Sequence, residues 1–511
     1  MKARNLASKL WTLLWVAVWC VTLTFVTVTP VTTTSLQPQS TTDVITAPSY
    51  LFNRTGFNYD MVDGTSILAD LGVVRYNQFL MDLQNSQGQA LPEVVVAVLD
   101  SGVDADHAVF GENRERLLTD YAVNFCLQIE DATGRPVSSG LTANDWDSDA
   151  SGHGTHVAGI IADSTLANVK ILPIRIFCGT DNTMGLNTFN NAVNYLCALK
   201  EGKPTYLNGY WYNTQRTKLN IVAVNLSLGT TGIEAVKSND DLLTRTNRDY
   251  QSYINSLCGA AILPIAAAGN ISKDNGETNT KSYYSFPASC AGAVSVSAYD
   301  FYNDYDLADF SYYNNCVSIS APGVGIWSAC SDDVYDRYSK RNQTYVDPGT
   351  GIKYLQLSGT SMATPFVTIC YALLMSDPTK TTAATLGIDS WDPTVDYARP
   401  YYYVTMQEKA LLLHALDLYE DNEPGMNDPY YGYGGINVED FAQATVAVQT
   451  SKTAGELLVN NVNTQPVVGN DTLAGEVSEW GTVVWILVGV GLIFLLINMV
   501  KSAFPLRRGE E

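Results

Sequence analysis

Five short apolar runs rich in β-branched residues recur along the first three fifths of this chain of 511 residues, and they constrain its fold more than any other feature. These runs cover residues 94–99, 169–177, 221–226, 261–268 and 293–298. A run this short and this uniformly apolar is typical of a strand buried on both faces. Helical patterns at 157–162, 188–199 and 240–257 lie between several of the runs. Strands that alternate with helices predict an α/β fold with a mostly parallel central sheet, covered by helices on both faces.

The charge balance narrows the class of partner. The chain has 30 basic and 52 acidic residues, a formal net charge of −22. A nucleic-acid phosphate backbone requires a concentrated surface of Lys and Arg, so we expect no nucleic-acid partner. A hydrophobic content of 46% is enough to bury a sizeable core, which excludes disorder as the dominant state.

Both ends of the chain carry apolar segments. Residues 1–30 place basic residues ahead of an apolar run at 10–28, which is typical of a secretory signal peptide; the run is also long enough for an uncleaved signal anchor, and both interpretations stay open. Residues 481–500 carry no charge and are followed by a basic tail at 501–511, which predicts a C-terminal transmembrane helix with a cytoplasmic end. We therefore expect a single-pass membrane protein whose main body is extracytoplasmic.

The remaining segments differ in composition. Residues 31–66 are a Thr-rich extension, residues 67–448 hold the compact patterned region, and residues 449–480 are a linker rich in Asn, Thr, Val and Gly. Two polar and aromatic stretches without clear periodicity, at 204–219 and 331–354, are predicted to be long surface loops.

Cysteine usage agrees with export. Cys20 lies in the first apolar run, which leaves eight cysteines, an even number that permits disulfides in an oxidising compartment. Eight cysteines allow 105 pairings, and the sequence does not choose among them. Cys370 lies in an apolar run and is predicted to be a buried thiol. The absence of a CxxC or Cys/His cluster from the sequence argues against a structural zinc site.

Three polar residues stand on turns framed by glycines. Asp100 ends the run at 94–99, His153 opens a helical pattern between two glycines, and Ser361 precedes an apolar helical run at 366–375. The carboxyl ends of parallel strands are where sites form in open α/β sheets. A carboxylate can orient a histidine, and the histidine can take the proton of a serine that attacks a carbonyl carbon. The pattern therefore predicts an acyl-transfer nucleophile.

The chain resembles the subtilisin-like serine proteases (subtilases, peptidase family S8) over roughly residues 65–448, because the order Asp, His, Ser is that of subtilisin. Five strings carry the resemblance: DSG at 100–102, SGHGTHVAG at 151–159, VNLSLG at 224–229, AAAGN at 266–270 and SGTSMATP at 358–365. The resemblance implies a three-layer α/β/α fold and a serine endopeptidase acting on protein or peptide substrates. It also implies that Asp100, His153 and Ser361 are catalytic and that the Asn270 amide stabilises the oxyanion.

The same resemblance implies how substrate is held. Ser227, Leu228 and Gly229 would bind the substrate backbone as an added strand. Gly229, Gly269 and Ser285 would line the pocket for the side chain before the scissile bond. Since no carboxylate points at the base of this pocket in the sequence reading, a neutral or apolar side chain is expected there.

Two further expectations concern metal binding and the roles of the histidines. Val109 stands where family members often have an aspartate that binds calcium, and the loop at 163–168 is too short for the usual ligand loop. We expect no required cofactor and no metal among the site residues, while a weak structural calcium at the acidic loop 304–309 stays open. His156 is the alternative histidine of its motif; the resemblance favours His153, and His156, His107 and His414 are expected to be structural.

The order of segments refines the resemblance. Residues 30–94 are too few to hold both a full propeptide and the first elements of the domain, so no full propeptide is expected. The layout is similar to that of mycosins, the membrane-anchored proteases of bacterial type VII secretion, which implies the membrane and membrane-complex subunits as partners. The competing hypothesis is a catalytically silent subtilase-fold scaffold of a membrane complex. The intact Asp100, His153, Asn270 and Ser361 favour the enzyme.

Overall fold

The computed structural model describes residues 67–88, 90–130, 136–178, 184–234, 241–341, 343–348, 351–379 and 428–438. The predicted signal or anchor, extension, linker, membrane helix at 481–500 and tail, as well as His414, lie outside these residues. Among the described residues, no helix combines the length and the apolar character needed to cross a membrane.

A seven-stranded parallel sheet forms the centre of the described region, in the order β13-β12-β10-β8-β1-β5-β2. Its strands are β1 (Val94–Asp100), β2 (Val123–Asn124), β5 (Val169–Arg175), β8 (Ile221–Leu226), β10 (Leu263–Ala267), β12 (Val294–Tyr299) and β13 (Ile319–Pro322). The five apolar runs are five of these strands, so the predicted parallel sheet is confirmed. Every residue of β1 and of β8 is buried, which explains why neither strand alternates between apolar and polar residues.

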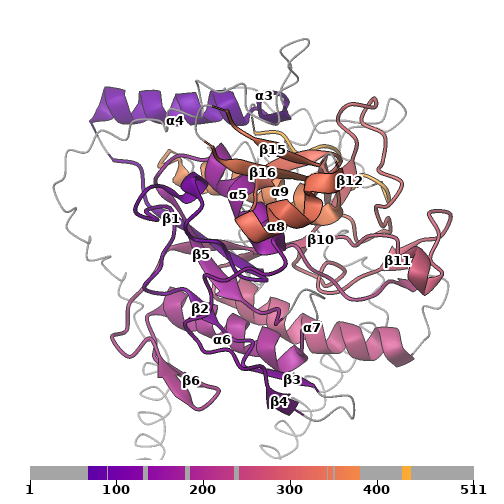
Figure 1. The fold of residues 1–511 in the computed structure, drawn as a ribbon, viewed down its shortest axis with the longest axis horizontal. Helices are drawn as coiled ribbons and strands as arrows, with labels where there is room; N and C mark the ends of the chain where they lie inside the picture. Colours follow the sequence, from indigo (N-terminus) through magenta and orange to yellow (C-terminus); the bar gives the residue numbers. More distant parts are fainter. Residues whose placement is uncertain are drawn as a thin grey trace, which may run out of the picture. The chain divides into compact units, whose positions relative to one another are not determined.

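Helices lie on both faces of this sheet (Figure 1). On one side α5 (His153–Ser164) packs against α9 (Thr360–Ser376), and α4 (Val73–Gln87) also contacts α9. On the other side α6 (Leu186–Glu201) packs against α7 (Asp241–Gly259). Nearly all of α9 is buried, because it is apolar around its whole circumference and contacts several strands.

Shorter elements complete the described region. They are α3 (Ile67–Asp70), η1 (Ala108–Phe110), β3 (Gln128–Glu130), β4 (Pro136–Ser138), β6 (Thr205–Leu207), β7 (Tyr210–Tyr212), β9 (Ile233–Glu234), η3 (Lys273–Asn275), β11 (Tyr283–Tyr284), β14 (Ile326–Ala329), α8 (Asp332–Tyr338), η4 (Ser339–Arg341), β15 (Thr344–Val346) and β16 (Lys353–Leu357). The prediction of two structureless loops is therefore wrong. Residues 204–219 contain the hairpin of β6 and β7, and residues 331–354 contain α8, η4, β15 and the start of β16. Strands of three residues are too short to show a periodic pattern.

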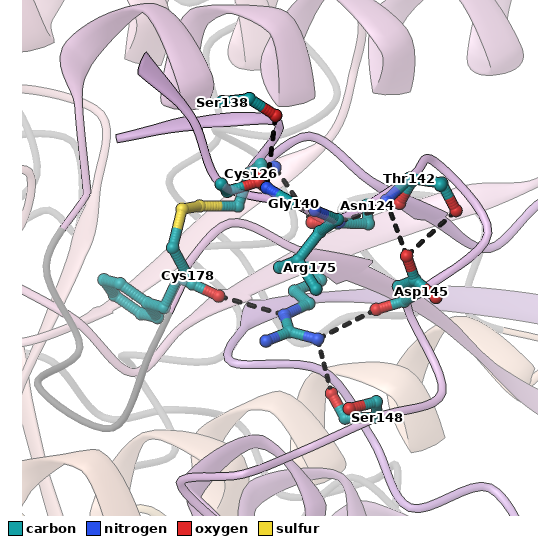
Figure 2. Close-up of a disulfide and its surroundings, with 12 residues drawn as sticks. Asn124, Cys126, Ser138, Gly140, Thr142, Asp145, Ser148, Arg175 and Cys178 are labelled. Carbon is teal, nitrogen blue, oxygen red and sulfur yellow. Dashed lines mark hydrogen bonds between the residues drawn. A yellow bond between two sulfur atoms is a disulfide. The ribbon is translucent and has the colours of Figure 1, made fainter. Parts of the chain in front are cut away.

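A disulfide joins Cys126 to Cys178, which confirms the prediction that the chain uses disulfides. Cys370 is buried and outside the disulfide, as predicted, and five further described cysteines are also outside it: Cys197, Cys258, Cys290, Cys316 and Cys330. Beside the disulfide, the buried Arg175 donates from Nε to the Phe177 carbonyl at 3.0 Å (Figure 2). Its Nη1 donates to the carbonyls of Asp145 at 3.0 Å and Ser148 at 2.8 Å. Arg175 thereby fixes the loop that leads into α5 to the end of β5.

Candidate active site

Asp100 and His153 meet where β1 ends and α5 begins. Asp100 is the last residue of β1 and its side chain is 1% exposed; His153 is the first residue of α5. The Nδ1 atom of His153 lies 2.8 Å from Oδ1 and 3.0 Å from Oδ2 of Asp100. Burial lowers the pKa of His153, but the charge of Asp100 and this hydrogen bond outweigh burial and raise the pKa above its ordinary value of 6.5. A carboxylate at Nδ1 fixes the tautomer that leaves Nε2 as the proton acceptor.

Ser361 is the second residue of α9, beside the end of β8. Its Oγ donates to the Ser227 carbonyl at 3.3 Å, and Ser227 Oγ donates to the Ser361 carbonyl at 2.7 Å. Within the described residues no hydrogen bond joins Ser361 Oγ to His153, so transfer of the Ser361 proton to His153 requires the hydroxyl group to give up its bond to the Ser227 carbonyl. Such bonds are often longer or absent without substrate.

Asn270 is held by the start of α9. Its Oδ1 accepts from Thr360 N at 2.9 Å and from Thr360 Oγ1 at 3.1 Å. A Cβ atom placed on Gly359 would lie 3.4 Å from Asn270 Nδ2 and 3.7 Å from Ser361 N. Two N–H donors, one from an amide side chain and one from a helix N-terminus, therefore converge beside Gly359. Such an arrangement can stabilise a negative oxygen that forms next to Ser361.

Asp149 is a second buried carboxylate that the sequence reading missed. Its Oδ1 accepts from Ser101 Oγ and from Gly152 N, both at 2.8 Å. Its Oδ2 accepts from Thr155 N at 2.8 Å and from Thr155 Oγ1 at 2.6 Å. Ser101 in turn donates its backbone N–H to Asp100 Oδ1 at 2.7 Å. Asp149 thus connects the turn after β1 to the N-terminus of α5.

The position of Asp149 explains its structural role and why the sequence did not reveal it. Two of its four donors are amides at the N-terminus of α5, Gly152 N and Thr155 N, and the other two are hydroxyl groups. Asp149 therefore acts as the helix cap that Gly152 cannot provide with a side chain. Asp149 is one of three aspartates between residues 145 and 149, an acidic run that reads as a solvated loop. The usable signal was its spacing, four residues ahead of the histidine that opens the helix.

Replacing Asp149 with asparagine is expected to lower kcat/KM by about 10–100-fold, the usual effect of losing a hydrogen-bonded group that orients a reacting one. Asp149 also raises the pKa of His153 through its charge. Without that charge the imidazolium is less stable, the pKa of His153 falls, and the acid limb of the pH–rate profile should move to lower pH. The profile of Asp147→Asn is the matched control, because Asp147 is half-exposed and lies 3.6 Å from Arg114. An acid limb that stays in place in Asp149→Asn would show that Asp149 does not position His153.

The predicted substrate-binding residues follow the ends of β8 and β10. Ser227 and Leu228 are buried, and Gly229 is exposed. Gly269 has a φ of 110°, and a Cβ atom there would collide with the ring of Tyr312. Ser285 is fully buried and is not exposed on the wall of the pocket. Its Oγ donates to the Thr230 carbonyl at 2.9 Å.

Ser285 and Tyr312 together fill the space beneath the two glycines. A Cβ atom on Gly229 would collide with Ser285 Oγ, and one on Gly269 would lie 3.1 Å from Ser285 Cβ. Tyr312 donates its hydroxyl to the buried Glu277, a carboxylate that the sequence reading did not include. The Glu277 carboxylate also accepts from Ser272 N at 2.8 Å. The floor between the two glycines is therefore occupied by protein atoms.

The other described histidines lie in structural positions. His156 Nε2 lies 3.1 Å from the Ile326 carbonyl and 3.0 Å from the Leu355 carbonyl, and burial lowers the pKa of His156 to about 3. His107 Nε2 lies 2.9 Å from the Lys353 carbonyl. In the part of the chain that the structure describes, which includes the loop 304–309, no three His, Cys, Asp or Glu residues are grouped to hold a metal ion.

Comparison with known proteins places this geometry in context. A protein-family model described as Subtilase family matches residues 92–434. The chain is 28% identical over 290 residues to Subtilase-type proteinase RRT12 of Saccharomyces cerevisiae, covering 57% of this chain and 44% of that protein. It is 30% identical over 228 residues to Thermostable alkaline protease of Halalkalibacterium halodurans, covering 45% and 48%. It is 28% identical over 304 residues to Subtilisin DY of Bacillus licheniformis, covering 58% and 81%. The chain spans about half the length of the first two relatives.

Proposed function

The chain belongs to the subtilase family, and we propose that it is a serine endopeptidase that hydrolyses peptide bonds in protein or peptide substrates. The observation that carries the proposal is the direct contact of His153 Nδ1 with the buried Asp100 carboxylate, at 2.8 Å. This contact gives the imidazole a defined tautomer and an increased affinity for a proton. A catalytically silent scaffold requires neither a defined imidazole tautomer nor a raised affinity of His153 for a proton.

In the proposed reaction Ser361 Oγ attacks the carbonyl carbon of the scissile bond, and His153 takes the serine proton on Nε2. The Asp100 carboxylate stabilises the imidazolium that forms. Asn270 Nδ2 and Ser361 N donate to the oxyanion of the tetrahedral intermediate. His153 then gives its proton to the leaving amine, and water hydrolyses the acyl-enzyme by the same steps in reverse.

We propose that the substrate backbone pairs with residues 227–229 as an added strand. The filled floor beneath Gly229 and Gly269 favours a small, uncharged side chain before the scissile bond, because a larger one would meet Ser285 and Tyr312.

Replacing Ser285 with glycine is expected to raise kcat/KM for leucine or phenylalanine before the scissile bond about tenfold relative to alanine, because the change removes the atoms that fill the floor. A matched peptide series measured on both proteins checks this. Ser289→Gly is the control, since Ser289 Oγ accepts from Ser285 N at 3.2 Å but is not among the atoms nearest to a Cβ placed on Gly229 or Gly269. A wild-type preference for lysine or arginine that Glu277→Gln abolishes would contradict the proposal.

We further propose that the protein is anchored in a membrane by residues 481–500 and exported by residues 1–30, with the peptidase domain extracytoplasmic and no resident cofactor. The charge-free apolar segment and its basic tail support this. The order of segments is similar to that of mycosins and supports a role beside a secretion system.

A membrane-impermeant fluorophosphonate applied to intact cells that make the full chain tests the function and its location together. We expect a labelled full-length protein in the membrane fraction. Labelling only after the cells are lysed would contradict the extracytoplasmic location, and no labelling of the folded protein in either state would favour the silent scaffold.

A further inference from the structure

The hairpin formed by β6 and β7 presents three large aromatic side chains to solvent. Tyr206 is 57% exposed, Tyr210 is 63% exposed and Trp211 is 64% exposed. The two strands are joined by the two-residue turn Asn208-Gly209, and both turn residues have positive φ, the geometry of a tight hairpin. The hairpin contacts α6, on the side of the sheet opposite α9 (Figure 1).

Side-chain contacts of Leu207 and Tyr212 hold the hairpin on the surface of the domain. Leu207 is buried, and the Tyr212 ring lies 5.5 Å from the rings of both Phe125 and Tyr195. On the outer face Tyr206 pairs across the strands with Trp211, with ring centroids 5.2 Å apart. The face of Leu207 and Tyr212 is therefore anchored in the domain, whereas Tyr206 and Trp211 on the other face are exposed to solvent, as is Tyr210 beside the turn.

Cations surround the base of this hairpin although the chain as a whole is strongly acidic. Residues 200–218 contain four basic residues and one acidic residue, 4 − 1 = +3, so the rest of the chain carries −22 − 3 = −25. Arg216 and Lys218 are exposed, and so is Lys203, whose Nζ is paired with the Glu201 carboxylate at 2.5 Å. They gather around Gly202, whose Cβ position lies 3.2 Å from the Arg216 carbonyl and 3.4 Å from Lys218 Cβ. The sequence from 202 to 218 contains no Asp or Glu.

Another exposed aromatic residue of the described region lies among charges of the opposite sign. Tyr302 is 51% exposed, but it lies in a loop whose charged residues, at positions 300, 304, 306 and 309, are all aspartates. An aromatic residue surrounded by carboxylates is repelled by an anionic surface. Aromatic side chains surrounded by Lys and Arg match the interfacial layer of an anionic bilayer, where tyrosine and tryptophan rings sit at the headgroups and cations contact lipid phosphates.

We propose that residues 203–218, the aromatic hairpin surface, dock on the interfacial layer of an anionic lipid bilayer through Tyr206, Tyr210 and Trp211, with Lys203, Arg216 and Lys218 contacting the headgroups. Charge complementarity carries the choice of a bilayer, since residues 200–218, with a net charge of +3 in an acidic chain, coincide with the most exposed aromatic side chains of the described residues. The membrane helix predicted at 481–500 would keep the peptidase domain close to a bilayer. Docking would hold the peptidase domain in one orientation on the membrane.

The test uses the full chain in vesicles of phosphatidylcholine alone, and of phosphatidylcholine and phosphatidylglycerol in equal parts, with brominated acyl chains as a tryptophan quencher. The part of the emission that disappears in Trp211→Phe reports on the hairpin. We expect this part to be quenched strongly in the anionic vesicles and weakly in the neutral ones. A second reporter, Tyr302→Trp in the Trp211→Phe background, is expected to remain unquenched, because all the charged residues of its loop are aspartates, which an anionic bilayer repels.

Replacing Lys203, Arg216 and Lys218 with glutamine should reverse the quenching in anionic vesicles, at about fivefold in the docking equilibrium for each cation. Equal quenching of the two reporters would overturn the proposal, since it would mean that a tether alone brings the domain near lipid. Absence of Trp211 quenching in both vesicle types would also overturn it and would leave a protein partner as the occupant. Peptide hydrolysis measured on the same samples separates either result from a failure of the proposed enzyme activity.

Discussion

Replacing Ser361 with alanine is expected to abolish fluorophosphonate labelling and to lower kcat for peptide hydrolysis by on the order of 10⁶-fold. The variant loses the only atom that attacks the substrate in the proposed reaction, while the Asp100–His153 contact and the Asn270 amide remain. Because the Ser361 side chain makes a single hydrogen bond, at 3.3 Å to the Ser227 carbonyl, its removal should leave the fold intact. Active-site titration and circular dichroism on the same preparation measure the two effects.

Ser358→Ala is the matched control for this prediction. Ser358 is exposed, lies three residues before Ser361 and accepts no proton in the proposed reaction; its Oγ accepts only from Gly325 N at 2.9 Å. We expect this variant to be labelled and active. Labelling that persists in Ser361→Ala but disappears in Ser358→Ala would place the nucleophile elsewhere and contradict the proposed mechanism.

Replacing Asn270 with leucine is expected to lower kcat by about 10²–10³-fold with little change in KM. The Nδ2 donor meets a negative charge only once the tetrahedral intermediate forms, so its loss weakens binding of the transition state and not of the substrate. Leucine keeps the approximate size of asparagine and removes the amide. Steady-state kinetics on a single peptide substrate separate kcat from KM.

Thr360→Val is the control for the Asn270 prediction, because Thr360 contacts the Oδ1 end of the Asn270 amide. Thr360→Val removes the Oγ1 donor to Asn270 Oδ1 and keeps the backbone donor at 2.9 Å, so the amide should stay nearly in place and kcat should fall far less than in Asn270→Leu. A rise in KM without a change in kcat for Asn270→Leu would show that this amide binds the substrate and would exclude it from the oxyanion site.

Features that are encoded in a short contiguous stretch of sequence could be predicted. The strands were predictable because a strand buried on both faces is apolar at every position, as β1 and β8 are. Asp100, His153, Asn270 and Ser361 were recognisable because each lies inside a short motif with its own glycines. The geometry that relates them could only be assumed, and the structure shows Asp100 and His153 in contact and Ser361 bonded to Ser227.

Features that depend on distant contacts were not predictable in the same way. The role of Asp149 depends on Ser101, which is 48 positions away, and its burial depends on the loop that Arg175 holds. The burial of Ser285 depends on the carbonyl of Thr230, 55 positions away. The hairpin of β6 and β7 was missed for a different reason: its Asn208-Gly209 turn is a strong local signal, but its three-residue strands have no measurable period.

The Cys126–Cys178 disulfide links the stability of the segment that carries His153 to the oxidation state of the two thiols. The cross-link spans 52 positions and encloses Asp149 and His153, whereas Asp100 and Ser361 lie outside it. In the chain-entropy model, closing a loop of this length stabilises the folded state by about 4 kcal/mol. A newly made copy whose thiols are still reduced lacks that contribution in the segment that carries the general base. In the proposed enzyme, formation of this disulfide therefore adds stability to the segment that carries His153 when the two thiols are oxidised.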